Sequence, residues 1–194
     1  MIRAPHEIAT PGPAADAAAR MQAALPRLET ARLILRAPRL EDFEIYARIG
    51  ASDRGRHLVA DNTDRAALWL DFTQMVATWL LRGHGVWTVE ARTDGAVLGF
   101  VLIGFEPGDH EPELGYLFRE TAEGRGYAQE AATAARDHAL TTLALPGLVS
   151  TIDPDNARSI RLATRLGAAR DCAAEAAHGN SIRVYRHPTP EART

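Results

Sequence analysis

The stretch LGYLFRETAEGRGYAQE, residues 114–130, carries the most specific pattern of the chain. It predicts a strand that ends at Phe118, a short polar loop, and an alanine-rich helix that begins after Gly124 and Gly126. Glycines let the backbone approach a ligand closely, and the unpaired N–H groups of a first helical turn point toward it. The partial positive charge of the helix end also attracts an anion. The stretch therefore indicates a cradle for a pyrophosphate group.

A second glycine pair, Gly83 and Gly85, has the same spacing but lies between a predicted helix and a predicted strand, so it indicates only a turn. A dinucleotide fingerprint would require a small residue where Gln129 stands and an acidic residue about 20 positions later. Its strand–helix unit also usually opens the chain, whereas this one starts beyond residue 110. A nucleotide-binding domain that is stabilised by NAD or ATP is therefore a poor alternative.

A second group of candidate site residues, 153–159, follows the next predicted strand. Pro154 turns the chain, Asn156 is expected to cap a helix, and Ser159 lies one turn later on the same face. Alone, these residues indicate a capped helix with an exposed serine. Beside the glycine loop, they favour a ligand site.

The remaining pattern predicts a mixed α/β sheet with early hairpins and later helices on its faces. Strands are expected at residues 32–36, 86–91, 96–105, 113–118 and 148–152, near Ala169, and at 182–186. Helices are expected at residues 40–49, 64–81, 126–143 and 156–166. Asn62 or Thr63 is the expected cap of the second helix, and Asp94-Gly95 is a hairpin turn.

Composition excludes several classes of protein. The 194 residues suit one domain, and neither a membrane span nor a signal peptide is expected, which together with the single cysteine, Cys172, favours a cytoplasmic protein. The net charge of −3 gives no reason to expect nucleic acid as a partner. All 22 basic residues are arginine, so a Walker-type phosphate loop and Schiff-base chemistry, which need lysine, are excluded.

These motifs, in this order, resemble the GNAT superfamily of N-acetyltransferases, in particular the branch related to ribosomal-protein N-terminal acetyltransferases. The resemblance covers about residues 29–187. The superfamily signature is Gln or Arg, two variable residues, Gly, one variable residue, then Gly or Ala, and it falls on residues 123–128. Residues 127–131, 115–116, 156–159 and 166–167 also match the branch.

The chain departs from this pattern at two places. Glu123 replaces the usual Gln or Arg, and we expect its side chain to face solvent, because a carboxylate would repel a pyrophosphate. Many relatives also place a tyrosine on the helix after Asn156 as the acid that protonates the leaving thiolate. In this chain the position that resembles it is occupied by Ala163, so Ser159 is the remaining candidate acid on that helix.

The resemblance implies a mixed α/β fold with a mostly antiparallel, twisted sheet of about seven strands, splayed between the fourth and fifth, and helices on both faces. Residues 1–28 would form a flexible extension rich in alanine and proline, residues 29–187 the N-acetyltransferase domain, and residues 188–194 a C-terminal tail. The implied co-substrate is acetyl-CoA, without a metal. The expected coenzyme-binding residues are Tyr116, Leu117, Phe118, Gly124, Arg125, Gly126, Tyr127, Ala128, Asn156 and Ser159.

The expected reaction is direct attack of a primary amine on the thioester in a ternary complex. Ser159 and Glu113 are the expected catalytic residues, with Glu113 as the base that takes the proton of the amine. His84, Glu90, His110, Glu111, Asp153 or a water chain are alternatives for that base. Cys172 is expected to be inert packing.

The acceptor would be a small-molecule amine or a protein N-terminal amine, and a homodimer is possible by resemblance. A non-catalytic acyl-CoA-binding or sensor module on the same fold is the alternative function. Coenzyme binding without turnover would distinguish this module from the enzyme.

Overall fold

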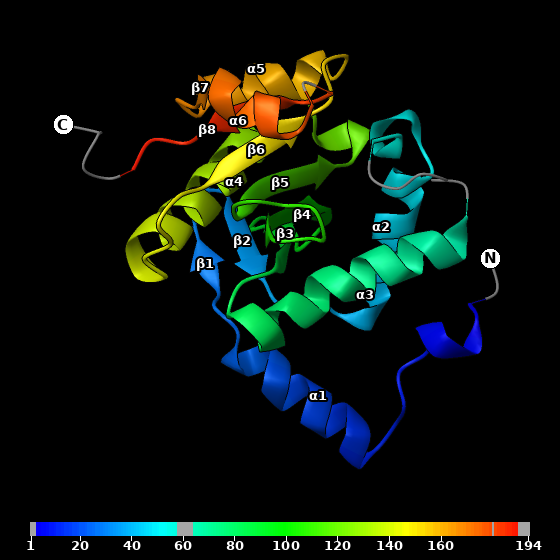
Figure 1. The fold of residues 1–194 in the computed structure, drawn as a ribbon. Helices are drawn as coiled ribbons and strands as arrows, with labels where there is room; N and C mark the ends of the chain where they lie inside the picture. The colour runs from blue at the N-terminus through cyan, green and yellow to red at the C-terminus, as the bar shows by residue number, and fades with distance from the viewer. Residues whose placement is uncertain (1–2, 58–63, 180, 190–194) are drawn as a thin grey trace.

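One eight-stranded sheet organises the chain (Figure 1), and the computed structural model describes residues 3–57, 64–179 and 181–189. The strand order is β1-β2-β3-β4-β5-β6-β8-β7. β5 and β6 run parallel, and the other neighbouring strands of the described chain run antiparallel. The strands are β1 (Leu28–Glu29), β2 (Leu33–Arg36), β3 (Val86–Ala91), β4 (Val97–Gly104), β5 (Glu113–Phe118), β6 (Val149–Ile152), β7 (Ala169–Arg170) and β8 (Arg183–Arg186).

Helices cover both faces of this sheet. The α-helices are α1 (Pro13–Ala24), α2 (Phe43–Gly50), α3 (Arg65–Arg82), α4 (Tyr127–Asp137), α5 (Ala157–Arg165) and α6 (Cys172–Ala177). Three short 3-10 helices matter for the site, namely η2 (Leu40–Asp42), η3 (Asp53–Gly55) and η4 (Glu120–Ala122). None of the helices in the described part of the chain combines the length and the apolar character that a bilayer crossing requires.

β4 shows how the two faces are separated. Phe100 and Leu102 pack with α2 and α3 in one core, whereas Val101 and Ile103 pack with α4 in another. Successive side chains of a strand point to opposite faces, so a strand covered on both sides is apolar almost throughout. On β5 the same alternation places Glu113 on the α2/α3 face and Tyr116 on the opposite face.

β5 and β6 diverge soon after they meet. Only one residue pair, Glu113 and Val149, is in register between the two described strands. Beyond it, side-chain hydrogen bonds take the place of backbone hydrogen bonds between the strands. The Ser150 hydroxyl donates to the carbonyl of Leu114 at 2.7 Å, and the Thr151 N–H donates to the Glu113 carboxylate at 3.2 Å. The predicted splay between the fourth and fifth predicted strands lies here. It leaves the β6-facing edge of β5 without a strand partner.

The predicted fold class is confirmed, with differences in detail. β1, which pairs with β2, is an eighth strand that the sequence pattern did not reveal. Within the N-terminal segment, for which no helix was predicted above, residues 13–24 form the 12-residue helix α1. The helix predicted from residue 40 begins as η2 before it continues as α2, and α6 was not predicted.

The cap predicted for α3 was wrong. Asn62 and Thr63 lie outside the described residues, and the Asp64 carboxylate instead accepts the N–H of Ala66 at 2.8 Å. Any of several neighbouring Asp, Asn or Thr residues can cap a helix, so local sequence fixes the cap only to within one or two positions.

A buried ion pair joins β2 to the start of α2. Arg36 donates two hydrogen bonds to Asp42, at 2.7 and 2.9 Å, and a third to Glu90 at 2.6 Å. Asp42 also accepts the Thr88 hydroxyl at 2.8 Å, and both Arg36 and Asp42 are buried. This network fixes α2, and with it Tyr46, against the sheet.

Removing one partner of this pair should destabilise the fold strongly. We expect Asp42→Ala to lower the free energy of unfolding by about 3–5 kcal/mol, because it leaves the Arg36 guanidinium buried without its main counter-ion. Arg48→Gln is the matched control, since Arg48 forms an exposed pair with Glu44 that should contribute below about 1 kcal/mol. Urea denaturation measures both variants, and equal losses would contradict the assignment.

Candidate active site

A cavity of about 1210 Å³ lies where β5 and β6 diverge. It is lined by residues from α2, α3, β4, β5, the glycine loop, β6 and α5. Most residues predicted for the site line this cavity, namely Glu113, Tyr116, Leu117, Phe118, Gly124, Gly126, Ala128, Asn156 and Ser159. The structure therefore gathers residues from both sequence motifs around one space.

The glycine loop has a backbone conformation that favours glycine. Gly124 and Gly126 have φ values of 68° and 76°, a region in which residues with a side chain are strained. Gly126 precedes the first residue of α4, and it supplies no side chain to cap the helix. The N–H groups of the first turn of α4 are thus not held by a cap side chain.

Arg32 holds this loop from outside the cavity. Its guanidinium donates to the carbonyl of Arg125 at 2.9 Å, lies 4.7 Å from the centre of the Tyr127 ring, and pairs with Glu130 at 2.7 Å. Arg125 and Tyr127 do not line the cavity. Their side chains stack on each other, with 5.1 Å between the Arg125 guanidinium and the Tyr127 ring centre. Coenzyme binding by these two residues remains a prediction, and it concerns their backbone amides.

The first turn of α5 faces the same space. The predicted cap is confirmed, because the Asn156 side chain accepts the N–H of Ser159 at 3.2 Å. The Tyr116 hydroxyl, from β5, donates to the carbonyl of Ser159 at 3.1 Å. A tyrosine hydroxyl thus lies beside α5 although no tyrosine occurs on that helix, and burial raises the pKa of Tyr116.

The open edge of β5 presents alternate backbone groups to the cavity. The N–H of Arg119 points to β4, where it donates to Leu98, and the carbonyl of Leu114 points to β6. Because hydrogen-bonding groups alternate along a strand, Tyr116 and Phe118 share the direction of Leu114. The hydrogen-bonding groups of Leu117 face β4 instead.

Glu113 lies at the start of β5, and its carboxylate accepts hydrogen bonds from the N–H and the hydroxyl of Thr151. Burial raises the pKa of Glu113 to about 7, against the lowering effect of these bonds. A carboxyl group with this pKa exists in both protonation states at neutral pH, as a general base requires.

Three further carboxylates line the cavity. Asp71 from α3 accepts the hydroxyl of Tyr46, and Glu106 and Asp109 follow β4. Burial and mutual repulsion raise the pKa of Glu106, and burial raises that of Asp71. Within the described residues, no arginine lies at ion-pair distance from any of these three or from Glu113. This part of the cavity is therefore rich in carboxyl groups.

Most of the other candidates for the general base lie outside the cavity lining. The buried His84 contacts the carbonyl of Ile103, Glu90 pairs with Arg36, and Glu111 pairs with Arg186 at 2.6 Å, all away from the cavity lining. The His110 ring packs on the ring of His178 outside it. Of the alternatives, Asp153 alone lines the cavity, where it lies 3.2 Å from His57.

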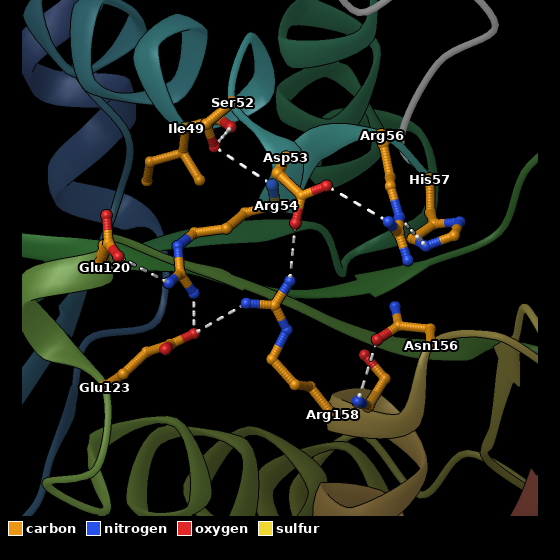
Figure 2. A network of polar contacts seen from close by, with 11 residues as sticks. Ile49, Ser52, Asp53, Arg54, Arg56, His57, Glu120, Glu123, Asn156 and Arg158 are labelled. Carbon is orange, nitrogen blue, oxygen red and sulfur yellow. Dashed lines mark hydrogen bonds and ion pairs between the residues drawn. The ribbon is translucent and has the colours of Figure 1, made fainter.

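The Glu123 side chain is 43% exposed, as expected, but its carboxylate is also ion-paired with Arg54 of η3 and lies 3.5 Å from Arg158 of α5 (Figure 2). These ion pairs arise from the tertiary structure, because the folded chain brings two arginines to the start of the glycine loop. Cys172 is likewise exposed at the start of α6 rather than packed, and it does not line the cavity.

Sequence reasoning missed the residues that enter the cavity from α2, η3 and α3, including Tyr46, Arg54 and Asp71. No local motif marks them. The helical pattern of residues 64–81 identified a helix but not which of its polar side chains would face a ligand.

Comparisons with known proteins identify the family of the chain. The family described as Acetyltransferase (GNAT) domain matches residues 32–169. The crystal structure of an acetyltransferase from Agrobacterium tumefaciens is 38% identical, covers 86% of this chain and 96% of that chain, and superimposes with a TM-score of 0.79. A ribosomal-protein alanine acetyltransferase from Vibrio fischeri, 14% identical, shares the fold over 87% of this chain and 100% of that chain, with a TM-score of 0.60.

Among curated proteins, YkkB of Bacillus subtilis is 37% identical over 92 residues, which are 44% of this chain and 52% of that protein. The matched part of this chain thus spans about half the length of the curated relatives. Because the family match covers most of the chain and includes the glycine loop, the chain belongs to the GNAT acetyltransferase family and is an acyltransferase.

Proposed function

We propose that this enzyme transfers the acetyl group of acetyl-CoA to a primary amine by direct attack in a ternary complex. The observation that carries the proposal is one cavity with two chemically different parts. Glycine-loop amides and arginines lie at the carboxyl ends of β5 and β6, and carboxylates lie near the amino end of β5. An anionic coenzyme and a cationic amine would therefore meet at the divergence of the strands.

The coenzyme part fits an extended thioester. In the proposal, the pyrophosphate lies on the amides of residues 124–128, and the pantetheine arm pairs with the open edge of β5 as an added strand. The N–H groups of Tyr116 and Phe118 are then the donors available to the thioester carbonyl. A donor of this kind that binds the developing oxyanion contributes about 3–4 kcal/mol.

The carboxylate part fits the acceptor. An amine with a pKa near 10 arrives protonated, and Asp71, Glu106 and Asp109 would attract it electrostatically. Glu113, with its pKa near 7, would then remove the proton that prevents attack. Neither Glu113 nor its neighbours need a metal for this step.

The transfer balances without an enzyme-bound intermediate. The ammonium ion first gives one proton to Glu113, which releases it to solvent. The amine nitrogen then forms a bond to the thioester carbon, the carbon–sulfur bond breaks, and the nitrogen gives its second proton to Glu113. The sulfur leaves as a thiolate and takes a proton through the Ser159 hydroxyl, the proposed donor, which regains a proton from solvent. The thiol that forms has a pKa near 8.5, so protonation of the leaving thiolate requires little assistance.

The proposed acceptor is a small-molecule amine or a protein N-terminal amine. The ribosomal-protein acetyltransferases among the structural neighbours support the second class, and the carboxylate-lined part of the cavity suits either. Turnover of acetyl-CoA with a panel of amines tests the proposal. Tight binding of acetyl-CoA without turnover of any amine would favour a sensor module instead.

Calorimetry with acetyl-CoA tests the glycine loop. Gly124→Ala should weaken binding about tenfold, because a side chain at positive φ costs about 1–2 kcal/mol and turning the loop to relieve the strain moves its amides. Gly95→Ala is the matched control, since Gly95 has a φ of 70° and equally open surroundings in a distant hairpin turn. Equal affinities for both variants would exclude the loop as the binding element.

The pH profile of kcat/KM tests Glu113. Activity should fall as the pH drops below about 7, because protonated Glu113 cannot accept a proton. In Glu113→Gln the rate should fall about 10²-fold and this inflection should disappear, leaving the rise that comes from the amine itself.

Thr151→Val separates the role of Glu113 as a base from its role in the strand divergence. It keeps the carboxylate but removes a hydrogen bond that lowers its pKa, so the inflection should move to higher pH. An unchanged profile in both Thr151→Val and Glu113→Gln would rule Glu113 out as the base.

Ser159→Ala should lower kcat by less than about tenfold, since protonation of a thiolate is a modest task. Ser181→Ala, a change of the same size outside the cavity lining, should leave kcat unchanged. If Ser159→Ala equals the parent enzyme at every pH, Ser159 is not the donor.

A further inference from the structure

Glu123 occupies the one position of the family signature where this chain departs from Gln or Arg. Its carboxylate lies between two guanidinium groups that come from distant parts of the chain, Arg54 of η3 and Arg158 of α5 (Figure 2). Both arginines line the cavity, and Glu123 directly precedes Gly124. An anion site formed by two arginines is thus already occupied by a carboxylate of the protein itself.

The two arginines differ in their freedom to move. The Arg54 side chain is 15% exposed and has a second, longer contact to Glu120 at 3.6 Å. Arg158 is 45% exposed and also pairs with Asp53 at 3.3 Å. Glu123 is 43% exposed, so its carboxylate can turn into solvent at little cost while Arg54 stays in the cavity.

We propose that Arg54 and Arg158 bind a phosphate of the coenzyme, and that Glu123 is the internal counter-ion that a phosphate group displaces. The inference rests on the proposed coenzyme binding. Carboxylate and phosphate oxygens are equivalent acceptors for an arginine fork, so a phosphate oxygen can replace the Glu123 oxygen. Glu123 cannot stay where it is, because it would then face a more highly charged anion across a few ångströms.

Displacement gives Glu123 a different role in the free protein and in the complex. In the free protein, Glu123 lies between the two arginines, and each of them also contacts a second carboxylate, Glu120 or Asp53. In the complex, it takes the solvent-facing orientation that the sequence led us to expect. Glu123 therefore limits coenzyme affinity, whereas the Gln of the usual signature would not compete as an anion.

Titration calorimetry with coenzyme A over a series of NaCl concentrations tests this exchange. Glu123→Gln should bind coenzyme A about tenfold more tightly than the parent at low salt, and its affinity should fall more steeply as salt rises. Glu41→Gln makes the same change in net charge at an exposed residue outside the cavity lining, and it should bind as the parent does.

A double-mutant cycle identifies the arginines as the cause. In Arg54→Gln the added Glu123→Gln change should bring little or no gain, and Arg158→Gln provides the same test should Arg54→Gln not fold. Dephospho-coenzyme A, which lacks the 3′-phosphate, shows which phosphate the two arginines bind. If Glu123→Gln raises the affinity for it as much as for coenzyme A, the arginines bind the pyrophosphate. If that increase in affinity is lost, they bind the 3′-phosphate.

The outcomes are separable. If the parent protein binds no coenzyme A, the proposed function fails. If the parent binds and Glu123→Gln binds equally or more weakly, Glu123 orients the arginines instead of competing for them, and the displacement is overturned.

Discussion

The divergence of β5 and β6 is the constraint on which the site depends. Two parallel strands that stayed paired would satisfy each other's backbone and leave no cavity between them. Here Ser150 bonds to Leu114 and Thr151 bonds to Glu113, so side chains take over where the ladder stops. Because Ser150 donates to Leu114, its oxygen accepts from His187 at 3.1 Å, and burial keeps that imidazole neutral by lowering its pKa to about 4.

This divergence links the fold to the proposed chemistry through two residues of β5. Glu113 bonds β6 and is also the proposed base, and Tyr116 reaches α5 while its backbone faces the open edge. The same strand thus holds the cavity open and presents groups to the proposed reaction. The buried pair of Arg36 and Asp42 fixes α2 against the sheet, and α2 contributes Tyr46 to the wall of the cavity.

The sequence was sufficient where function depends on local geometry. The bounds of β5, the glycine loop before α4, and the cap at Asn156 could be predicted because turn glycines, strand alternation and capping act within a few residues. The partners of Glu123 could not be predicted, because they depend on how distant elements meet. For the same reason, the pattern gave no indication of Asp71.

The carboxylate cluster of Asp71, Glu106 and Asp109 has a consequence for product release in the proposed reaction. An amine enters the proposed reaction as a cation, but the amide that forms carries no charge at that nitrogen. Asp71, Glu106 and Asp109 therefore attract the incoming molecule and lose that attraction once the acetyl group has been transferred. The cavity would discriminate against its own product on electrostatic grounds, so accumulated amide would compete poorly with fresh substrate.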